Sequence, residues 1–167
     1  MGSNAIRILG IDPGLRNTGY GLIEQRGANL VFIACGAITT GAGHSLAERL
    51  AQIHRALVAL IEKERPDEAA IEETFVNRDP QSALKLGQAR GIALSVPALL
   101  GLPVAEYAAN VVKKTIVGVG HAEKAQVAMM VKMLLPASPA ASPDAADALA
   151  LAITHAQHRN LKRRGAA

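Results

Sequence analysis

Three β-strand patterns precede the first helical pattern of this chain, and that order restricts the fold more than any other feature. Mostly apolar segments at residues 5–12, 18–24 and 30–40 are separated by short breaks, which is typical of antiparallel strands. Helical patterns then alternate with two further strand patterns, at residues 67–72 and 103–107. Parallel strands need long crossover connections, usually helical. The sequence therefore predicts an α/β fold with a five-stranded mixed sheet flanked by helices.

The helical segments have recognisable boundaries. Ser45-Leu-Ala-Glu48 fits a capping box, and the amphipathic helix that it begins is expected to end at Pro66. A second helix is expected over residues 80–100, with Pro97 kinking it or ending it early. Further helices are expected at residues 110–117, 122–135 and 143–158, the last with Ser142 as its N-cap.

Length and composition suit one compact domain. The chain has 167 residues, half of them apolar, and residues 6–158 are expected to form a single domain. Residues 1–5 look like a cloning scar, and residues 159–167 form a basic tail that we expect to be disordered. The single cysteine, Cys35, excludes an internal disulfide and a thiolate zinc site. No segment fits a signal peptide or a membrane span, so we expect a cytoplasmic protein.

The charge distribution leaves two interpretations open. Lysine and arginine number 18 against 14 aspartates and glutamates, and four of these bases lie in the tail, so the rest of the chain is balanced. Within that balanced part, residues 78–132 carry seven bases and three acids. Such an excess is compatible with a polyanion-binding face, but charge counts alone favour an ordinary solvated surface.

Acidic residues follow strand and helix boundaries at places where they can meet. Asp12 ends the first predicted strand and Glu72 or Glu73 ends the fourth, while Asp144 and Asp147 lie on one face at the start of the last helix. Each has an ordinary alternative, because acids favour helix N-termini and strand ends are often solvated. Asp12 is harder to explain in that way, since it follows a buried-strand pattern.

A cluster of carboxylates needs a counter-charge. Several carboxylates in one place cannot all stay ionised unaided, and hard divalent cations with oxygen ligands supply the missing charge. Two such ions about 4 Å apart can activate water and stabilise a leaving oxygen in phosphodiester hydrolysis. The acids therefore point to a metal-dependent nuclease as one candidate.

Several longer motifs resemble the RuvC-type Holliday junction resolvases, in unbroken order over most of the chain. The matching segments are Gly10-Ile-Asp-Pro-Gly14, Asn17-Thr-Gly-Tyr-Gly21, Ile71-Glu-Glu-Thr-Phe75, residues 82–91, 111–115, 118–124 and 143–150, and Thr154-His155. The first motif alone is weak, because many ribonuclease-H-like ATPases open with a similar strand. The whole set in this order is far more specific.

The resemblance implies a ribonuclease-H-like fold and a set of catalytic residues. It places four catalytic, metal-binding acids on Asp12, Glu72, Asp144 and Asp147, and it selects Glu72 over Glu73 because the family's acid directly follows the last apolar residue of its strand. It also implies Mg²⁺ as the cofactor, two ions per active site, with Mn²⁺ able to substitute.

The resemblance further implies how the protein meets its substrate. The substrate is four-way junction DNA, which a homodimer nicks symmetrically on two opposing strands during recombination and repair. Two DNA-binding lysines fall on Lys113 and Lys124, and an aromatic residue that pushes against bases near the crossover falls on Phe75. A solvated helix face for the lysines, and a core or dimer contact for Phe75, are the alternatives. A branch-migration motor is a further implied partner, and no surface motif identifies where it would bind.

Other function classes remain open at this point. A phosphate-binding ATPase could share the first strand, but such enzymes enclose their nucleotide between two domains and this chain supplies one. A junction-binding module without catalysis would not need all four acids. Another ribonuclease-H-like nuclease, acting on RNA–DNA hybrids, also fits the acids. The helix predicted over residues 80–100 is the candidate dimer interface, unless its apolar face packs on its own sheet.

Overall fold

The computed structural model describes residues 5–73, 79–139 and 141–165, which form a mixed α/β structure. The strands are β1 (Ile6–Asp12), β2 (Asn17–Arg26), β3 (Asn29–Thr39), β4 (Glu68–Glu73) and β5 (Val104–Ala108). The helices are α1 (Leu46–Glu64), α2 (Pro80–Leu99), α3 (Ala109–Val117), α4 (Lys124–Leu134) and α5 (Pro143–Gly165).

The described strands form one sheet in the order β3-β2-β1-β4-β5, and the expected five-stranded mixed sheet is confirmed. β1, β2 and β3 are antiparallel neighbours, and β4 and β5 are added in parallel through helical crossovers. Ile11 of β1 pairs with Ile71 of β4. The carboxyl ends of β1 and β4 therefore lie side by side, and each carries an acid, Asp12 on β1 and Glu72 on β4.

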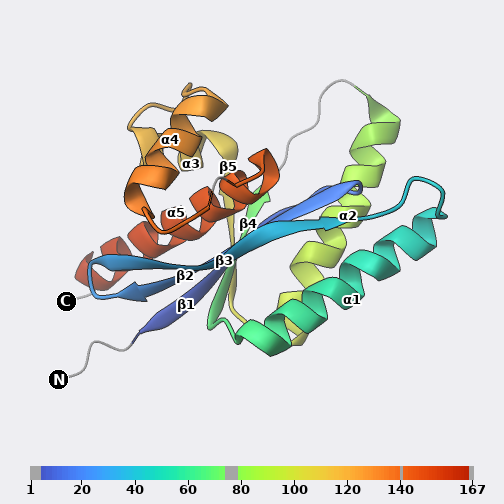
Figure 1. Ribbon diagram of the computed structural model, residues 1–167, viewed down its shortest axis with the longest axis horizontal. Helices are drawn as coiled ribbons and strands as arrows, with labels where there is room; N and C mark the ends of the chain where they lie inside the picture. The colour runs from blue at the N-terminus through green and yellow to red at the C-terminus, as the bar shows by residue number, and fades with distance from the viewer. Residues whose placement is uncertain (1–4, 74–78, 140, 166–167) are drawn as a thin grey trace.

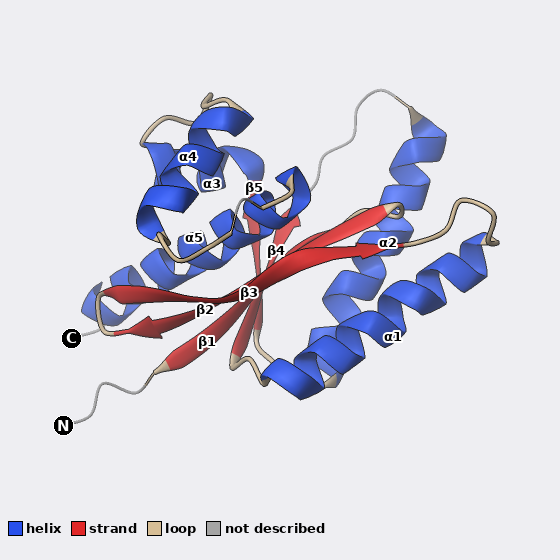
Figure 2. Ribbon diagram, viewed as in Figure 1, coloured by secondary structure: helices blue, strands red, loops and turns tan. Residues whose placement is uncertain are grey.

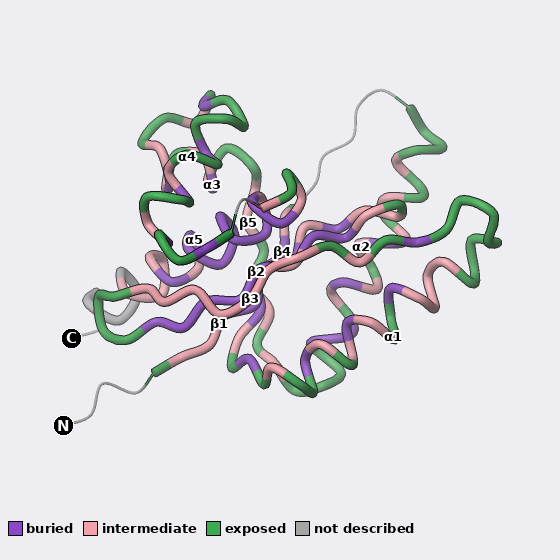
Figure 3. The backbone as a smooth tube through the Cα atoms, in the orientation of Figure 1, coloured by how far each residue is buried: buried purple, intermediate pink, exposed green. Residues whose placement is uncertain are grey.

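Helices cover both faces of the sheet (Figure 1, Figure 2). α1 and α2 pack on one face, around a core that includes Leu9, Ile11 and Ile71. α3, α4 and α5 lie on the other face, around a core that includes Ile8 and Ala70. Burial along the strands alternates between these two cores, because successive strand side chains point to opposite faces. α5 is the most deeply covered helix on its side, and the tube in Figure 3 shows buried segments where it crosses the sheet.

Glycines in β1 and β2 let α5 lie directly against the sheet. A Cβ atom on Gly10 would overlap the Ala148 carbonyl oxygen, and one on Gly21 would lie 2.6 Å from the Leu149 nitrogen. Gly10 and Gly21 face each other in the β1–β2 register. Any larger residue at these positions would push α5 away, so the glycines set the closeness of helix to sheet.

The helices differ from expectation at three places. α5 ends at Gly165 and not near His158, because residues 159–164 contain no helix breaker and Arg159 binds Glu68 across the helix–sheet contact. α2 continues past Pro97 to Leu99 without ending at the proline, which lies in the last turn. α4 begins at Lys124, with the Glu123 N–H donating to the Gln126 side chain 2.8 Å away.

The capping box of α1 is confirmed. The Glu48 N–H donates to the Ser45 hydroxyl, and the Ser45 N–H donates to the Glu48 carboxylate at 2.7 Å. Ser142 is likewise the N-cap of α5, since its hydroxyl accepts from the Ala145 N–H at 3.3 Å. Within the described ranges, no helix combines the length and the apolar character needed to cross a bilayer.

Candidate active site

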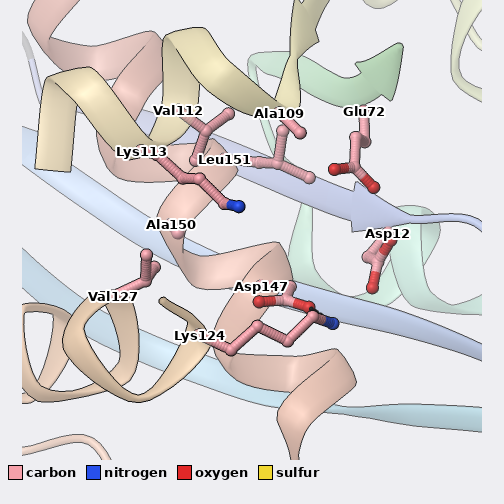
Figure 4. Close-up of a pocket in the computed structure, with 10 residues that line it drawn as sticks. All are labelled: Asp12, Glu72, Ala109, Val112, Lys113, Lys124, Val127, Asp147, Ala150 and Leu151. Carbon is pink, nitrogen blue, oxygen red and sulfur yellow. Dashed lines mark hydrogen bonds and ion pairs between the residues drawn. The ribbon is translucent and has the colours of Figure 1, made fainter. Parts of the chain in front are cut away.

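Five of the seven candidate site residues line one cavity of about 170 Å³ at the carboxyl ends of β1 and β4. Asp12, Glu72 and Asp147 supply carboxylates, and Lys113 and Lys124 supply the facing cations (Figure 4). The remaining wall is apolar, formed by Ala109, Val112, Val127, Ala150 and Leu151. An acidic site with apolar walls and two lysines at one place is therefore built from β1, β4, α3, α4 and α5.

Strand alternation decides which acids reach the cavity. Asp12 follows Gly10 by two residues on β1, and Glu72 follows Ala70 by two residues on β4, so both acids point to the α5 face. Glu73 points away and is exposed. The backbone at Glu72 is also held from the other face, because the Arg90 Nε on α2 donates to the Glu72 carbonyl oxygen at 3.0 Å.

The first turns of α5 carry the other two acids. Asp147 lines the cavity, and Asp144 lies one turn earlier on the same side of the helix. The backbone of Asp144 rests against β2 so closely that a Cβ atom on Gly19 would overlap its carbonyl oxygen. Asp144 does not line the cavity wall, yet its charge reaches Asp12.

Burial and neighbouring carboxylates raise the pKa of two acids, Asp12 and Glu72. Burial, together with the charges of Glu72, Asp147 and Asp144 and a hydrogen bond to Glu72, raises the pKa of Asp12 to about 8. Burial first, and then the charge of Asp147, raises the pKa of Glu72 above its usual range. The cluster therefore holds more negative charge than the protein alone can neutralise near neutral pH.

The two lysines neutralise only part of that charge. The Lys124 Nζ donates to Asp147 Oδ2 at 2.8 Å, and this hydrogen bond raises the pKa of Lys124 above its usual value. Lys113, half-buried on α3, lowers the pKa of Glu72 through its charge. The pKa of Asp12 remains raised in the presence of both lysines.

The donor set suits a hard divalent cation. All the available ligands are carboxylate oxygens, the kind that Mg²⁺ and Mn²⁺ prefer, and the raised pKa of Asp12 marks an unmet need for positive charge. In the described part of the chain, no three ligand side chains already converge as a finished metal site. A cation bound among these carboxylates would compete with Lys124 for Asp147.

Several residues that support the site were not predicted from the sequence. Gly10 and Gly21 seat α5, and Arg90 fixes the backbone at Glu72. The glycines within two neighbouring strand patterns could have indicated the role of Gly10 and Gly21. No local sequence pattern indicates the role of Arg90. Phe75 lies outside the described residues.

Comparison with known proteins identifies the family. The family model described as crossover junction endodeoxyribonuclease RuvC matches residues 8–155, which is most of the chain and includes every described candidate residue. The chain belongs to the RuvC family. The crossover junction endodeoxyribonuclease RuvC of Methylocella silvestris is 69% identical over 159 residues, covering 95% of this chain and 90% of that one. The RuvC of Xanthobacter autotrophicus is 58% identical over 167 residues, covering 100% and 99%.

Solved structures agree with the RuvC assignment. Thermus thermophilus RuvC in complex with Holliday junction substrate has a TM-score of 0.88 at 34% identity, covering 94% of this chain and 96% of that chain. A yeast mitochondrial Holliday junction resolvase has a TM-score of 0.64 at 16% identity, covering 95% and 84%, and this shows a shared fold. The ribonuclease-H-like fold expected for a RuvC relative is thus confirmed.

Proposed function

We propose that this RuvC-family endonuclease cuts two opposing strands of a four-way DNA junction, using Asp12, Glu72, Asp144 and Asp147 as its catalytic, metal-binding acids. The observation that carries this assignment is the cavity at the carboxyl ends of β1 and β4, where three of these acids meet two lysines. Three carboxylates from three separate elements line this cavity, and the fourth, Asp144, lies one turn before Asp147 on α5. Like charges repel, so an ordinary solvated surface would not bring these carboxylates together.

The cofactor that this site fits is a divalent cation, in keeping with the metal dependence of RuvC-family nucleases. We assign Mg²⁺, two ions per site, with Mn²⁺ as a substitute, and we assign all four acids as ligands. When bound there, the ions would activate a water molecule and stabilise the departing oxygen of the phosphodiester. The acids hold the ions, and the apolar wall of Val112, Val127 and Leu151 limits the access of bulk water.

The lysines bind the substrate phosphates in this proposal. A bare carboxylate cluster repels the DNA backbone, so cations at the cavity rim are needed to hold a strand there. Lys113 and Lys124 line that rim. Phe75 is proposed to press against bases near the crossover, three residues after Glu72 in the sequence.

A homodimer is proposed, because symmetric cutting of two strands needs two sites related by a twofold axis. We place the interface on α2, where Leu84 is 65% exposed and Leu99 is 79% exposed although other residues of this helix pack on α1 and the sheet. The nuclease domain is proposed to span residues 6–158, working in the cytoplasm with a branch-migration motor.

A cleavage assay tests the function directly. A synthetic mobile four-way junction is end-labelled on each strand in turn, and wild type and Asp12→Asn are compared with magnesium and with chelator. We expect paired nicks on two opposing strands only when wild-type protein is combined with magnesium. Linear duplex and an RNA–DNA hybrid serve as control substrates.

Two outcomes would redirect the proposal. Junction binding without cutting, whichever divalent metal is supplied, would make the protein a binding module. Cutting of the RNA–DNA hybrid alone would keep the acids and the metal but replace the substrate.

A further inference from the structure

A second cluster of charged and polar side chains lies at the other end of β4 and centres on Glu68. The Arg159 Nε donates to both Glu68 carboxylate oxygens at 2.8 Å, and the His155 Nε2 lies 2.6 Å from Glu68 Oε2. The Tyr107 hydroxyl lies 2.9 Å from the His155 Nδ1. These four residues, the Glu68 cluster, are largely buried, with side-chain exposures of 18% for Glu68, 12% for His155 and 19% for Arg159. None of them lines the acid cavity.

The hydrogen-bonding capacities of the Glu68 cluster match. A carboxylate can only accept, so the His155 Nε2 donates to Glu68, and in the neutral ring the Nδ1 accepts the Tyr107 hydroxyl proton. Burial by itself would raise the pKa of Glu68, but the hydrogen bonds from His155 and Arg159 outweigh it and hold that pKa below its usual range. Glu68 is therefore an ionised, well-partnered anchor, unlike the crowded carboxylates of the cavity.

The Glu68 cluster joins the elements that carry the site. Glu68 and Glu72 are four residues apart on β4 and share a face. His155 follows Asp144 by eleven residues, just over three full turns of α5, so the two lie on the same side of the helix and roughly 16 Å apart. Tyr107 belongs to β5, which runs directly into α3 with its cavity lysine.

Opposite electrostatic forces act at the two ends of this helix–strand contact. At the cavity end, β1, β4 and α5 each bring a carboxylate to the same cavity, so that like charges are crowded together there. At the Glu68 end, a carboxylate meets an arginine and a histidine. Without the second contact, repulsion at the first would favour tilting or sliding of α5 away from the sheet before a cation is bound.

We propose that the Glu68 cluster is a positioning device that holds α5 in register on β4, so that Asp144 and Asp147 already meet Asp12 and Glu72 when a divalent cation arrives. This inference rests on the proposed catalytic role of the four acids. Glu68, His155, Tyr107 and Arg159 act through α5 and touch neither DNA nor metal.

The chain supplies a matched control. Glu24 is also a buried carboxylate with two basic partners, since the Arg7 Nε donates to it at 3.1 Å and the Arg26 Nε at 2.7 Å. These contacts join β1 to β2 and leave α5 out. Glu68→Gln and Glu24→Gln therefore remove the same charge from similar surroundings, and only the first loosens the helix that carries Asp144 and Asp147.

The test measures metal binding and helix mobility in full-length protein without DNA. Mn²⁺ binding is followed by the electron paramagnetic resonance signal of the free ion, and amide hydrogen exchange over residues 144–150 is measured in chelator. For Glu68→Gln we expect Mn²⁺ affinity to fall about tenfold, as for other residues that orient metal ligands, and exchange to accelerate. Glu24→Gln is expected to stay within about twofold of wild type in Mn²⁺ affinity, with unchanged exchange in this segment.

A gentler variant and a rescue complete the design. Tyr107→Phe removes one hydroxyl and should weaken Mn²⁺ binding by about threefold, even if Glu68→Gln proves too unstable to study. Single-turnover junction cleavage by either variant should return to near the wild-type rate at saturating Mn²⁺. A residue that merely supports the fold would not shift the metal requirement in this way.

Equal losses of Mn²⁺ affinity in Glu68→Gln and Glu24→Gln would overturn the proposal, and so would unchanged affinity and exchange in both Glu68→Gln and Tyr107→Phe. Either result leaves the assigned function intact if Asp12→Asn still abolishes cutting. Failure of wild type to cut any junction would instead overturn the proposed function itself.

Discussion

The Lys124 Nζ lies 2.8 Å from Asp147 Oδ2, so a lysine cation already partners one of the acids that is assigned to metal. Lys124 is 77% exposed and reaches the acid from the first residue of α4. In the proposed function, the Asp147 carboxylate and a DNA phosphate therefore compete for the Lys124 ammonium group. A cation that binds Asp147 would release Lys124 toward the substrate.

Lys124→Met should separate these two partners. Removing a competing positive charge should tighten Mn²⁺ binding by about fivefold in the absence of DNA, while junction binding in chelator weakens. Calorimetry and gel-shift titration measure the two effects. Lys114→Met, an exposed lysine outside the cavity, is the control and should leave Mn²⁺ affinity unchanged. Weaker Mn²⁺ binding by Lys124→Met would contradict the competition.

Asp12→Asn should abolish nicking and preserve junction binding. The amide removes a metal ligand and a negative charge, but it removes no phosphate contact. Gel-shift titration in chelator should give an affinity equal to or tighter than that of wild type, and cleavage should fall below detection. A folded variant that no longer binds the junction would show that Asp12 has a different role.

The metal-free protein should lose stability as the pH rises. The folded-state pKa of Asp12 is about 8, against an ordinary value of 3.8, so the folded form holds a proton that the unfolded chain has released. Asp12 therefore lowers the free energy of unfolding progressively as the pH rises from about 4 to about 8. Urea unfolding in chelator should find Asp12→Asn more stable than wild type by on the order of 2 kcal/mol at pH 8, and by much less at pH 4.5. A difference that is constant with pH would exclude a raised pKa at Asp12.

Gly10→Ala should damage both stability and activity. Its new Cβ atom would overlap the Ala148 carbonyl oxygen, and α5 must then move off the sheet. We expect a loss of roughly 1–3 kcal/mol in unfolding free energy, together with loss of cutting, because Asp144 and Asp147 move with the helix. Gly43→Ala, where a Cβ atom meets open space, is the control and should change little. Thermal melts and the junction assay report the two quantities.

Lys113→Ala should weaken junction binding and lower its salt dependence by up to about one released ion. The measurement is a titration of binding affinity against salt concentration in chelator. Lys114→Ala, on the neighbouring exposed position of α3, should change the affinity less. An unaltered slope for Lys113→Ala would mean that this lysine acts on the carboxylates and not on a phosphate.

Much of the fold could be predicted from local sequence pattern. The order of strands and helices, the capping box at Ser45 and the N-cap at Ser142 all depend on neighbouring residues, and the structure confirms them. The end of α5 could not be predicted in that way. Its continuation past His158 is supported by the contact of Arg159 with Glu68, two residues that are far apart in the chain.

For the acids, too, some features could be predicted from local sequence and others depend on distant contacts. The positions of Asp12 and Glu72 at strand ends follow from sequence, but the choice between Glu72 and Glu73 needed the family motif, and strand alternation explains it only once the register is known. The Lys124–Asp147 pair and the Glu68 cluster were not foreseen, because both join helices to distant segments. Contacts of that kind are set by packing, which a single sequence does not display.

The dependence of the cavity on α5 has a consequence for how the enzyme is made. Asp12 and Glu72 emerge from the ribosome early, whereas Asp144 and Asp147 come from the helix that is translated after every other described element. A nascent or truncated chain that lacks this helix holds only half of the carboxylates. Nuclease activity would therefore switch on only when α5 docks, so that unfinished copies are harmless to the chromosome.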